Sequence, residues 1–183
     1  DFIAYLDSTE GAQNTMSTDG MDIGVGRIIC QTLNEAEAVV DKIINYNSVN
    51  SFGDWRSNIC FVADDVDDPA WEFRLQENID AVASRLDTAY ANYNISKIYL
   101  DSYQQVASSG GQRYPDARQA VVDQINKGTL MMHYYGHGGE VGWAEERVLE
   151  LIDINAWENI NNLAVFITAT CEFSRYDDAK RIS

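Results

Sequence analysis

The sequence predicts an α/β fold in which helices flank a mainly parallel central sheet. Short apolar runs alternate with amphipathic segments of about 12–20 residues, which is the pattern of βαβ units. The chain has 183 residues, of which 45% are hydrophobic, so it can bury the core of one domain or slightly more. Only two prolines and twelve glycines occur, which argues against a disordered or low-complexity chain.

The N-terminal part is predicted to contain two strands and one helix. The strands are expected at residues 1–6 and 22–30, joined by a polar loop. Residues 33–47 form a predicted amphipathic helix, since apolar residues recur there at spacings of three and four. Asn34 and Glu37 resemble a capping box at the start of this helix.

The part of the chain from residue 58 onward supplies the predicted sheet. Its strands are expected at residues 58–63, 95–100, 130–135 and 163–169. Helices are expected between them at residues 71–91, 115–126 and 153–161. Gly128 follows the second of these helices, and glycine is the usual residue just past a helix end.

Composition argues against several functions. The net charge of −16 argues against binding to nucleic acid or to an anionic membrane surface. No signal peptide or membrane-spanning apolar run is visible, but the chain lacks an initiator methionine and is expected to be a piece of a longer protein. Three cysteines are too few for a disulfide framework. Cys30 and Cys60 lie in apolar runs and are predicted to be buried, whereas Cys171 follows a strand.

Two residues capable of chemistry at neutral pH follow the last two predicted strands. One strand runs into the sequence GHGG, which contains His137, and the other runs into Thr170 and Cys171. If these strands are parallel neighbours, both residues leave the edge of the sheet where α/β proteins place their sites. A cysteine nucleophile needs a thiolate, which an imidazole can supply, and Gly138 and Gly139 let the backbone approach a substrate and an oxyanion. The alternative is a glycine-rich turn with an exposed histidine.

Acidic residues gather after the first strand of this part. Asp64, Asp65, Asp67 and Asp68 lie within five residues. One interpretation is a solvated loop, and the other is a calcium site at Asp64, Asp67 and Asp68, because hard cations take clustered oxygen ligands. The spacing does not match an EF-hand loop.

The loop after GHGG contains further candidates for substrate binding. Trp143 either lines a substrate pocket or packs the loop onto the sheet. Glu140, Glu145 and Glu146 either contact a basic substrate side chain or are solvated.

His133 precedes His137 by four residues, which invites a metal interpretation with Cys171 as a third ligand. Zinc peptidases, however, place such a histidine pair on a helix, with a glutamate next to the first histidine. Strand alternation puts His133 on the face of Met131 and Tyr135, so we expect a core-facing histidine and no zinc.

The two strand-end motifs resemble those of the gingipain family (C25) of caspase-like cysteine peptidases. The specific parts are GHGGEVGWAEER, the cysteine 34 residues after its histidine in VFITATC, and FVADD. The resemblance implies a caspase/gingipain-like three-layer sandwich. Residues 1–50 would be the end of the first subdomain, and residues 58–183 a caspase-like catalytic subdomain truncated at its C-terminal end.

The resemblance also implies roles for individual residues. Cys171 matches the nucleophile and His137 the catalytic histidine, while Gly138 and the backbone N–H of Cys171 match the oxyanion donors. An acidic residue accompanies the histidine in the family, and Asp65 is our candidate for it, with Asp64 next. Gly139, Glu140 and Trp143 are the expected substrate-binding residues. Caspases carry a glycine shortly after the cysteine, but here Glu172 follows, so cleavage preference stays open.

The implied activity is that of a cysteine endopeptidase whose acyl-enzyme is resolved by water or by an amine. The type of enzyme most similar in these motifs removes C-terminal secretion signals from type IX cargo. It works at the cell surface or outer membrane of Gram-negative bacteria. This implies a protein or peptide substrate, contact with other secretion-system components, and no required cofactor, with calcium as an option. Two alternatives stay open, namely a general secreted gingipain-like protease and a non-catalytic scaffold module of a secretion apparatus.

Overall fold

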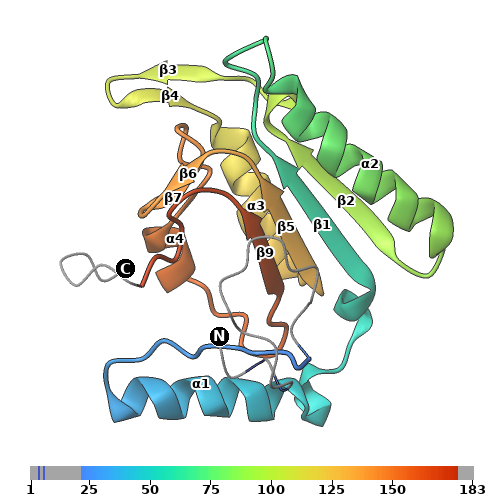
Figure 1. Cartoon of the computed structure of the whole chain (residues 1–183), viewed down its shortest axis with the longest axis vertical. Coiled ribbons are helices and arrows are strands. Elements are labelled where there is room, and N and C mark those ends of the chain that lie inside the picture. Colours follow the sequence, from blue (N-terminus) through green and yellow to red (C-terminus); the bar gives the residue numbers. More distant parts are fainter. Residues whose placement is uncertain (1–3, 5, 7–21, 177–183) are drawn as a thin grey trace. The chain divides into compact units, whose positions relative to one another are not determined.

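The structure is a computed structural model that describes residues 4, 6 and 22–176 (Figure 1). The chain divides into two compact units, Asp1–Val40 and Asp41–Ser183, with the division inside helix α1 (Leu33–Tyr46). Each unit is described by itself. The predicted subdomain boundary between residues 50 and 58 stays a prediction.

In the first unit, residues 22–32 form neither helix nor strand. The strand predicted at residues 22–30 is therefore wrong: its apolar side chains are exposed, and its glycines weaken a strand. Helix α1 is confirmed, but its capping box is formed by Thr32 and Glu35. Glu35 Oε2 accepts the Thr32 N–H (3.1 Å), and Thr32 Oγ1 accepts the Glu35 N–H (3.2 Å). The strand predicted at residues 1–6 and the loop after it lie almost entirely outside the described residues.

The second unit contains the predicted parallel sheet. Its strands are β1 (Asn58–Ala63), β2 (Asn94–Tyr99), β5 (Met131–Tyr135) and β9 (Val165–Ala169). They are arranged in the order β2-β1-β5-β9, and every neighbouring pair is parallel. The predicted fold class is thus confirmed, and all four strand predictions are correct to within two residues.

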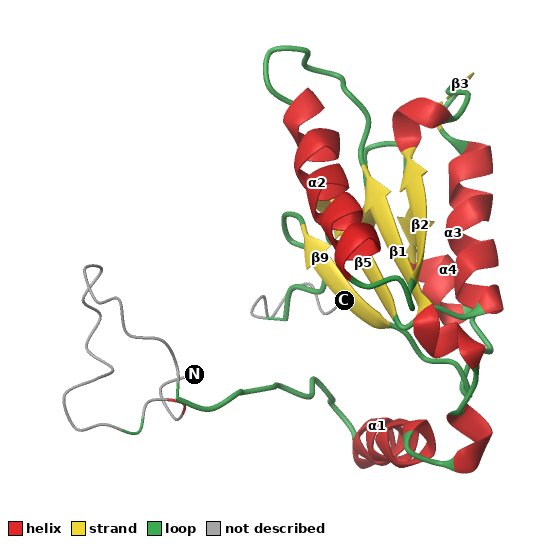
Figure 2. Ribbon diagram, turned by 90° about the vertical axis from the view of Figure 1, so that its right-hand side faces the viewer, coloured by secondary structure: helices red, strands yellow, loops and turns green. Residues whose placement is uncertain are grey.

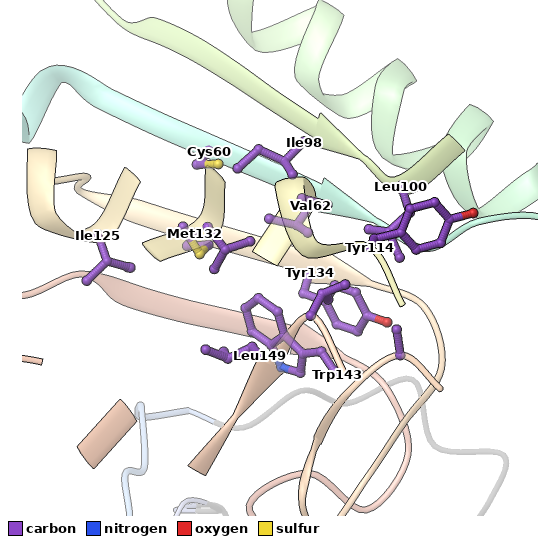
Figure 3. Close-up of a cluster of buried hydrophobic side chains, with 14 residues drawn as sticks. Cys60, Val62, Ile98, Leu100, Tyr114, Ile125, Met132, Tyr134, Trp143 and Leu149 are labelled. Carbon is purple, nitrogen blue, oxygen red and sulfur yellow. The ribbon is translucent and has the colours of Figure 1, made fainter. Parts of the chain in front are cut away.

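One helix covers each face of this sheet, which makes the three-layer sandwich. Helix α2 (Phe73–Ala89) packs Ile79 and Ala83 against β1, while helix α3 (Pro115–Lys127) packs Val121 and Ile125 against the opposite face (Figure 2). The α3 side has the larger core, whose labelled members in Figure 3 include Val62, Met132, Tyr134 and Trp143 from three strands. Gly128 ends α3 with a φ of 93°, as its position predicts.

Several short elements were not predicted. An antiparallel hairpin is formed by β3 (Val106–Ser108) and β4 (Gly111–Arg113). A three-stranded antiparallel sheet follows β5 and consists of β6 (Gly138–Gly139), β7 (Gly142–Trp143) and β8 (Leu149–Glu150). Single 3-10 turns occur at Val49–Ser51, Asp54–Ser57 and Leu100–Ser102.

The last helix begins earlier than predicted and is shorter. Helix α4 spans Leu151–Asn155, because Glu150 and Asp153 form a capping box that starts it two residues before the expected position. The predicted end at residue 161 is also wrong, since Ala156 is the C-cap.

Two of the cysteine predictions are tested by burial. Cys60 is fully buried, and burial raises the pKa of its thiol to about 12, so it is an inert core thiol. Cys30 is exposed, and its predicted burial is wrong because residues 22–32 form no core element. None of the described helices combines the length and the apolarity that crossing a membrane requires.

Candidate functional site

The register of the sheet brings His137 and Cys171 to the same edge. In the parallel pair β5 and β9, Tyr135 lies opposite Ala169, and these are the last residues of their strands. The Gly136 N–H donates to the Ala169 carbonyl at 3.3 Å, which keeps the two chains together one residue further. His137 and Cys171 are therefore each two residues beyond the last paired position. The predicted parallel neighbourhood of the two strands is confirmed.

The backbone of His137 is fixed by three hydrogen bonds. Its N–H donates to Asp64 Oδ2 (2.6 Å), and its carbonyl accepts from the Tyr134 hydroxyl (2.5 Å) and from the Ala144 N–H (2.9 Å). Gly136 is required beside this arrangement, because a Cβ there would lie 2.5 Å from both Asp64 Cβ and the Tyr134 hydroxyl oxygen. These contacts set the place from which the imidazole extends.

The imidazole of His137 is held by Glu72. Nε2 lies 2.8 Å from Glu72 Oε1, and the Trp71 ring meets the imidazole edge-on with a centroid distance of 5.7 Å. A hydrogen bond from the Asp68 N–H, helped by the imidazole, keeps the pKa of Glu72 below its ordinary value. Partial burial lowers the pKa of His137, but the hydrogen bond with Glu72 and the charge of Asp64 outweigh it and raise that pKa. The site thus favours an imidazolium.

Asp65, our candidate for the acid beside the imidazole, contacts Tyr114 instead. Its Oδ2 accepts from the Tyr114 hydroxyl (2.9 Å), and the Gln105 amide lies at 3.4 Å. The reason is that the chain leaves β1 with the Asp65 side chain on the side of α3. Glu72 was missed, because its only sequence signal is an acid near the start of a predicted helix, which many helices share.

The glycine loop approaches the residue before Cys171. A Cβ on Gly138 would overlap Thr170 Oγ1, so only glycine fits this contact. Gly139, by contrast, has open space where a Cβ would be. The close approach of Gly138 to Thr170 is compatible with the predicted oxyanion role of the Gly138 N–H. This role stays a prediction. The substrate contacts expected of Gly139 and Glu140 stay predictions as well.

The chain turns sharply after Cys171. The Phe173 N–H donates to the Cys171 carbonyl at 2.7 Å, and Glu172 and Ser174 have φ values of 54° and 61°. Residues other than glycine rarely adopt such left-handed conformations, and they cluster at functional sites. Cys171 itself is a free thiol and is exposed.

Trp143 is a core residue and not a pocket residue. It is fully buried and stacks on Tyr134 with a centroid distance of 4.5 Å and an interplanar angle of 5°. Phe166 and Phe173 pack around it at 6.0 and 5.9 Å. The expectation of substrate binding is therefore wrong, because β7 turns the ring inward and packs the loop onto the sheet (Figure 3).

The acidic residues gather differently from the predicted calcium site. Asp67 and Asp68 are exposed, and Asp68 Oδ1 accepts the Ala70 N–H (2.9 Å) in the turn before α2. The group with metal-like spacing consists instead of Asp64, Asp65 and Glu146, which offer one oxygen each within 4.8 Å of one another. Asp67 and Asp68 are not members of this group, and calcium binding stays a prediction.

These three acids are buried with 2%, 6% and 5% exposure. Two carboxylates 4.8 Å apart repel by about 3.5 kcal/mol at an effective dielectric constant of ~20. Burial, followed by repulsion among the carboxylates, raises the pKa of Asp64 to about 7. Burial and the charge of Asp65 raise the pKa of Glu146 to about 7 as well. Glu145, in contrast, is exposed.

His133 occupies the position that strand alternation predicts. It is half-buried on the α2 face and lies 5.8 Å from the Phe61 ring, and burial lowers its pKa. Within residues 22–176, the three buried acids form the only cluster of potential metal-binding side chains. His133, His137 and Cys171 do not form such a cluster among these residues.

A parallel α/β sheet with a histidine and a cysteine at the carboxyl ends of adjacent strands defines an α/β protein with a Cys–His site. The model of one family, Peptidase family C25, matches residues 1–183, and the chain belongs to this family. No curated protein matches the chain.

Solved structures agree with this fold. The chain is similar to the Arg-specific cysteine proteinase gingipain R (RgpB), with 20% identity, a TM-score of 0.59, and coverage of 81% of this chain and 32% of that one. It is also similar to the complex of Porphyromonas gingivalis RgpB pro- and mature domains, with 20% identity, a TM-score of 0.56, and coverage of 78% and 31%. The chain thus spans about a third of the length of these structures, and the gingipain-like fold is confirmed.

Proposed function

We propose that this chain carries the catalytic pair of a cysteine endopeptidase, with Cys171 as nucleophile and His137 as general acid and base. The observation that carries the proposal is the register of β5 and β9, which puts both residues two positions beyond Tyr135 and Ala169. Membership of a peptidase family supports the same conclusion.

The geometry around His137 suits the required proton transfers. Glu72 engages Nε2, which leaves Nδ1 to exchange a proton with the thiol. The raised pKa of His137 favours the imidazolium, which is the form that gives a proton to a leaving group. The thiolate attacks the peptide carbonyl, and His137 then gives its proton to the leaving amine. Water or another amine resolves the acyl-enzyme, with the Gly138 and Cys171 N–H groups facing the oxyanion.

For the substrate, we propose the C-terminal secretion signals of type IX cargo. This part rests on the resemblance of GHGGEVGWAEER and FVADD to the type IX secretion system signal peptidase PorU. The setting would be the cell surface or outer membrane of a Gram-negative bacterium, in contact with other secretion-system components. Incubating a cargo protein that retains its signal domain, with and without an added amine, separates hydrolysis from transpeptidation by product mass.

The test of the catalytic pair is labelling with a peptide acyloxymethyl ketone, followed by mass spectrometry. Cys30 is an exposed thiol of the same chain with no histidine assigned to it, so it serves as an internal control for general thiol reactivity. We expect an adduct on Cys171 that His137→Ala abolishes while Cys30 reacts slowly in both proteins. Equal labelling of Cys30 and Cys171, or labelling that His137→Ala leaves unchanged, contradicts the proposal.

A further inference from the structure

Trp71 is a large aromatic residue that lies beside the imidazole and outside the cores described above. Its side chain is 43% exposed, and it belongs to neither cluster of buried hydrophobic side chains. Its ring meets the His137 imidazole edge-on at 5.7 Å, and the side chain of His137 is itself 45% exposed. The two rings therefore form a surface that a ligand can reach, and tryptophan is enriched among residues that dominate binding.

The turn before α2 fixes the position of Trp71. The N–H groups of Trp71 and Glu72 both donate to the Asp68 carbonyl, at 3.3 and 3.1 Å. The Glu72 carboxylate accepts the Asp68 N–H in return, and it also lies 2.8 Å from His137 Nε2. The carboxylate that holds the imidazole thus belongs to the same closed turn as the indole beside it. A ring that is held in place before binding loses less entropy when a ligand covers it.

The role proposed for His137 decides which part of a substrate meets Trp71, so this step rests on the proposed function. His137 gives its proton to the leaving amine, and the amine nitrogen must therefore come within hydrogen-bond distance of the imidazole. The residue that carries this nitrogen is the first one after the scissile bond. It passes beside the imidazole and hence beside the ring that packs against the imidazole. An amine that resolves the acyl-enzyme enters at the same place, because it takes the reverse path.

We propose that Trp71 binds the residue directly after the scissile bond and favours an uncharged aromatic or large aliphatic side chain there. Covering an exposed indole removes apolar surface from water, and a pair of aromatic rings gains more than the area it buries. Charge of either sign is disfavoured at this place. An anion meets the exposed Glu145, whose charge helps to raise the pKa of His137, and a cation meets the imidazolium that this raised pKa favours.

The experiment compares two acyloxymethyl ketones that share one peptide but release different carboxylates, namely benzoate and acetate. The released carboxylate occupies the place of the leaving amine, so it probes the side of the site where Trp71 lies. The ratio of the Cys171 labelling rates with the two probes cancels any change in thiol reactivity that affects both equally. We expect Trp71→Ala to lower the ratio of benzoate to acetate labelling by about 3- to 10-fold, because it removes one aromatic pair. Trp71→Phe keeps an aromatic ring and should keep most of the ratio.

Phe73→Ala is the matched control for the loss of an exposed ring next to the same turn. The Phe73 side chain is 38% exposed, and its ring lies 5.8 Å from the Arg74 guanidinium carbon. We expect this variant to leave the ratio of the two labelling rates unchanged. Circular dichroism checks that each variant folds.

The outcomes separate this inference from the proposed function. A ratio that Trp71→Ala leaves unchanged, while His137 is still needed for labelling, overturns the role of Trp71 and leaves the catalytic pair in place. An equal fall of the ratio in Phe73→Ala also overturns it, because the effect would then come from the turn as a whole. If neither probe labels Cys171 in the unaltered protein, the proposed function itself is contradicted, and the role of Trp71 is contradicted with it.

Discussion

Gly138 allows a stringent test of how the site is assembled. A Cβ at this position would overlap Thr170 Oγ1 and approach Thr170 Cγ2 to 3.3 Å. Because Thr170 directly precedes Cys171, Gly138→Ala forces the glycine loop away from the nucleophile. An extra methyl group in a packed contact costs about 1–3 kcal/mol. If this strain acts on the reactive geometry, we expect Cys171 labelling to slow by roughly 5- to 150-fold.

The second substitution of this test is Thr170→Ala, which removes Oγ1 and Cγ2, the two Thr170 atoms that the new methyl group would contact. Thr170 Oγ1 is buried without a hydrogen-bond partner among the described residues, so its removal breaks no hydrogen bond to them. We therefore expect Cys171 in the single variant Thr170→Ala to be labelled at nearly the normal rate. The double variant should regain most of the lost rate, with a coupling energy of about 1 kcal/mol or more in the double-mutant cycle. The remaining neighbour, the Gly142 carbonyl at 3.2 Å, is tight but tolerable. A double variant as slow as Gly138→Ala refutes the contact as the cause.

Three further predictions follow from the same contacts. Glu72→Gln removes the hydrogen-bonded charge that raises the pKa of His137 and leaves the desolvation that lowers this pKa. The imidazole pKa measured by NMR should therefore fall. The alkaline limb of the pH profile of Cys171 labelling should move to lower pH with it. Trp143→Ala removes a fully buried ring and leaves a cavity, so it should lower the free energy of unfolding in urea by about 3–5 kcal/mol. Trp71→Ala, at a side chain that is 43% exposed, should change labelling with little loss of stability. Gly128→Ala should destabilise the protein by more than about 1 kcal/mol, since φ is 93° and the new Cβ would lie 2.6 Å from Trp55 Cβ.

Matched variants control these measurements. Glu77→Gln, on the exposed side of α2, removes a charge without touching His137 and should leave its pKa in place. Gly139→Ala adds a methyl group into open space and should alter stability by less than about 0.5 kcal/mol. An unchanged imidazole pKa in Glu72→Gln, or equal unfolding energies for Trp143→Ala and Trp71→Ala, contradicts the structural account.

The central strand of the sheet was predictable because it is buried on both faces. Strand β1 matches its predicted bounds, Asn58–Ala63, since a parallel strand between two helices needs a continuous apolar run. The same rule misled at residues 22–30, where an apolar run with two glycines is largely exposed and is not a strand. An apolar run indicates what a strand would bury but not whether a partner strand is present.

The loop between the histidine and the last strand was less predictable. Strands β6, β7 and β8 have two residues each, which is too short for any periodicity. Their pairing nevertheless decides where Trp143 lies, because Gly138 pairs with Trp143 and the ring then stacks on Tyr134. From the sequence, Trp143 could either line a substrate pocket or pack the loop onto the sheet. The antiparallel pairing of β6 with β7 accounts for its burial.

The choice of acid beside the imidazole depends on environment and not on position in the chain. Asp64 and Asp65 are the acids nearest to the strand end, but burial raises the pKa of both, so they lose part of their charge more readily than an exposed acid does. Glu72 lies before α2, where a backbone N–H lowers its pKa and keeps it charged. A charged carboxylate stabilises an imidazolium, whereas a protonated one does not. The fold therefore separates the acids by role: Glu72 positions the His137 ring, while Asp64 positions its backbone.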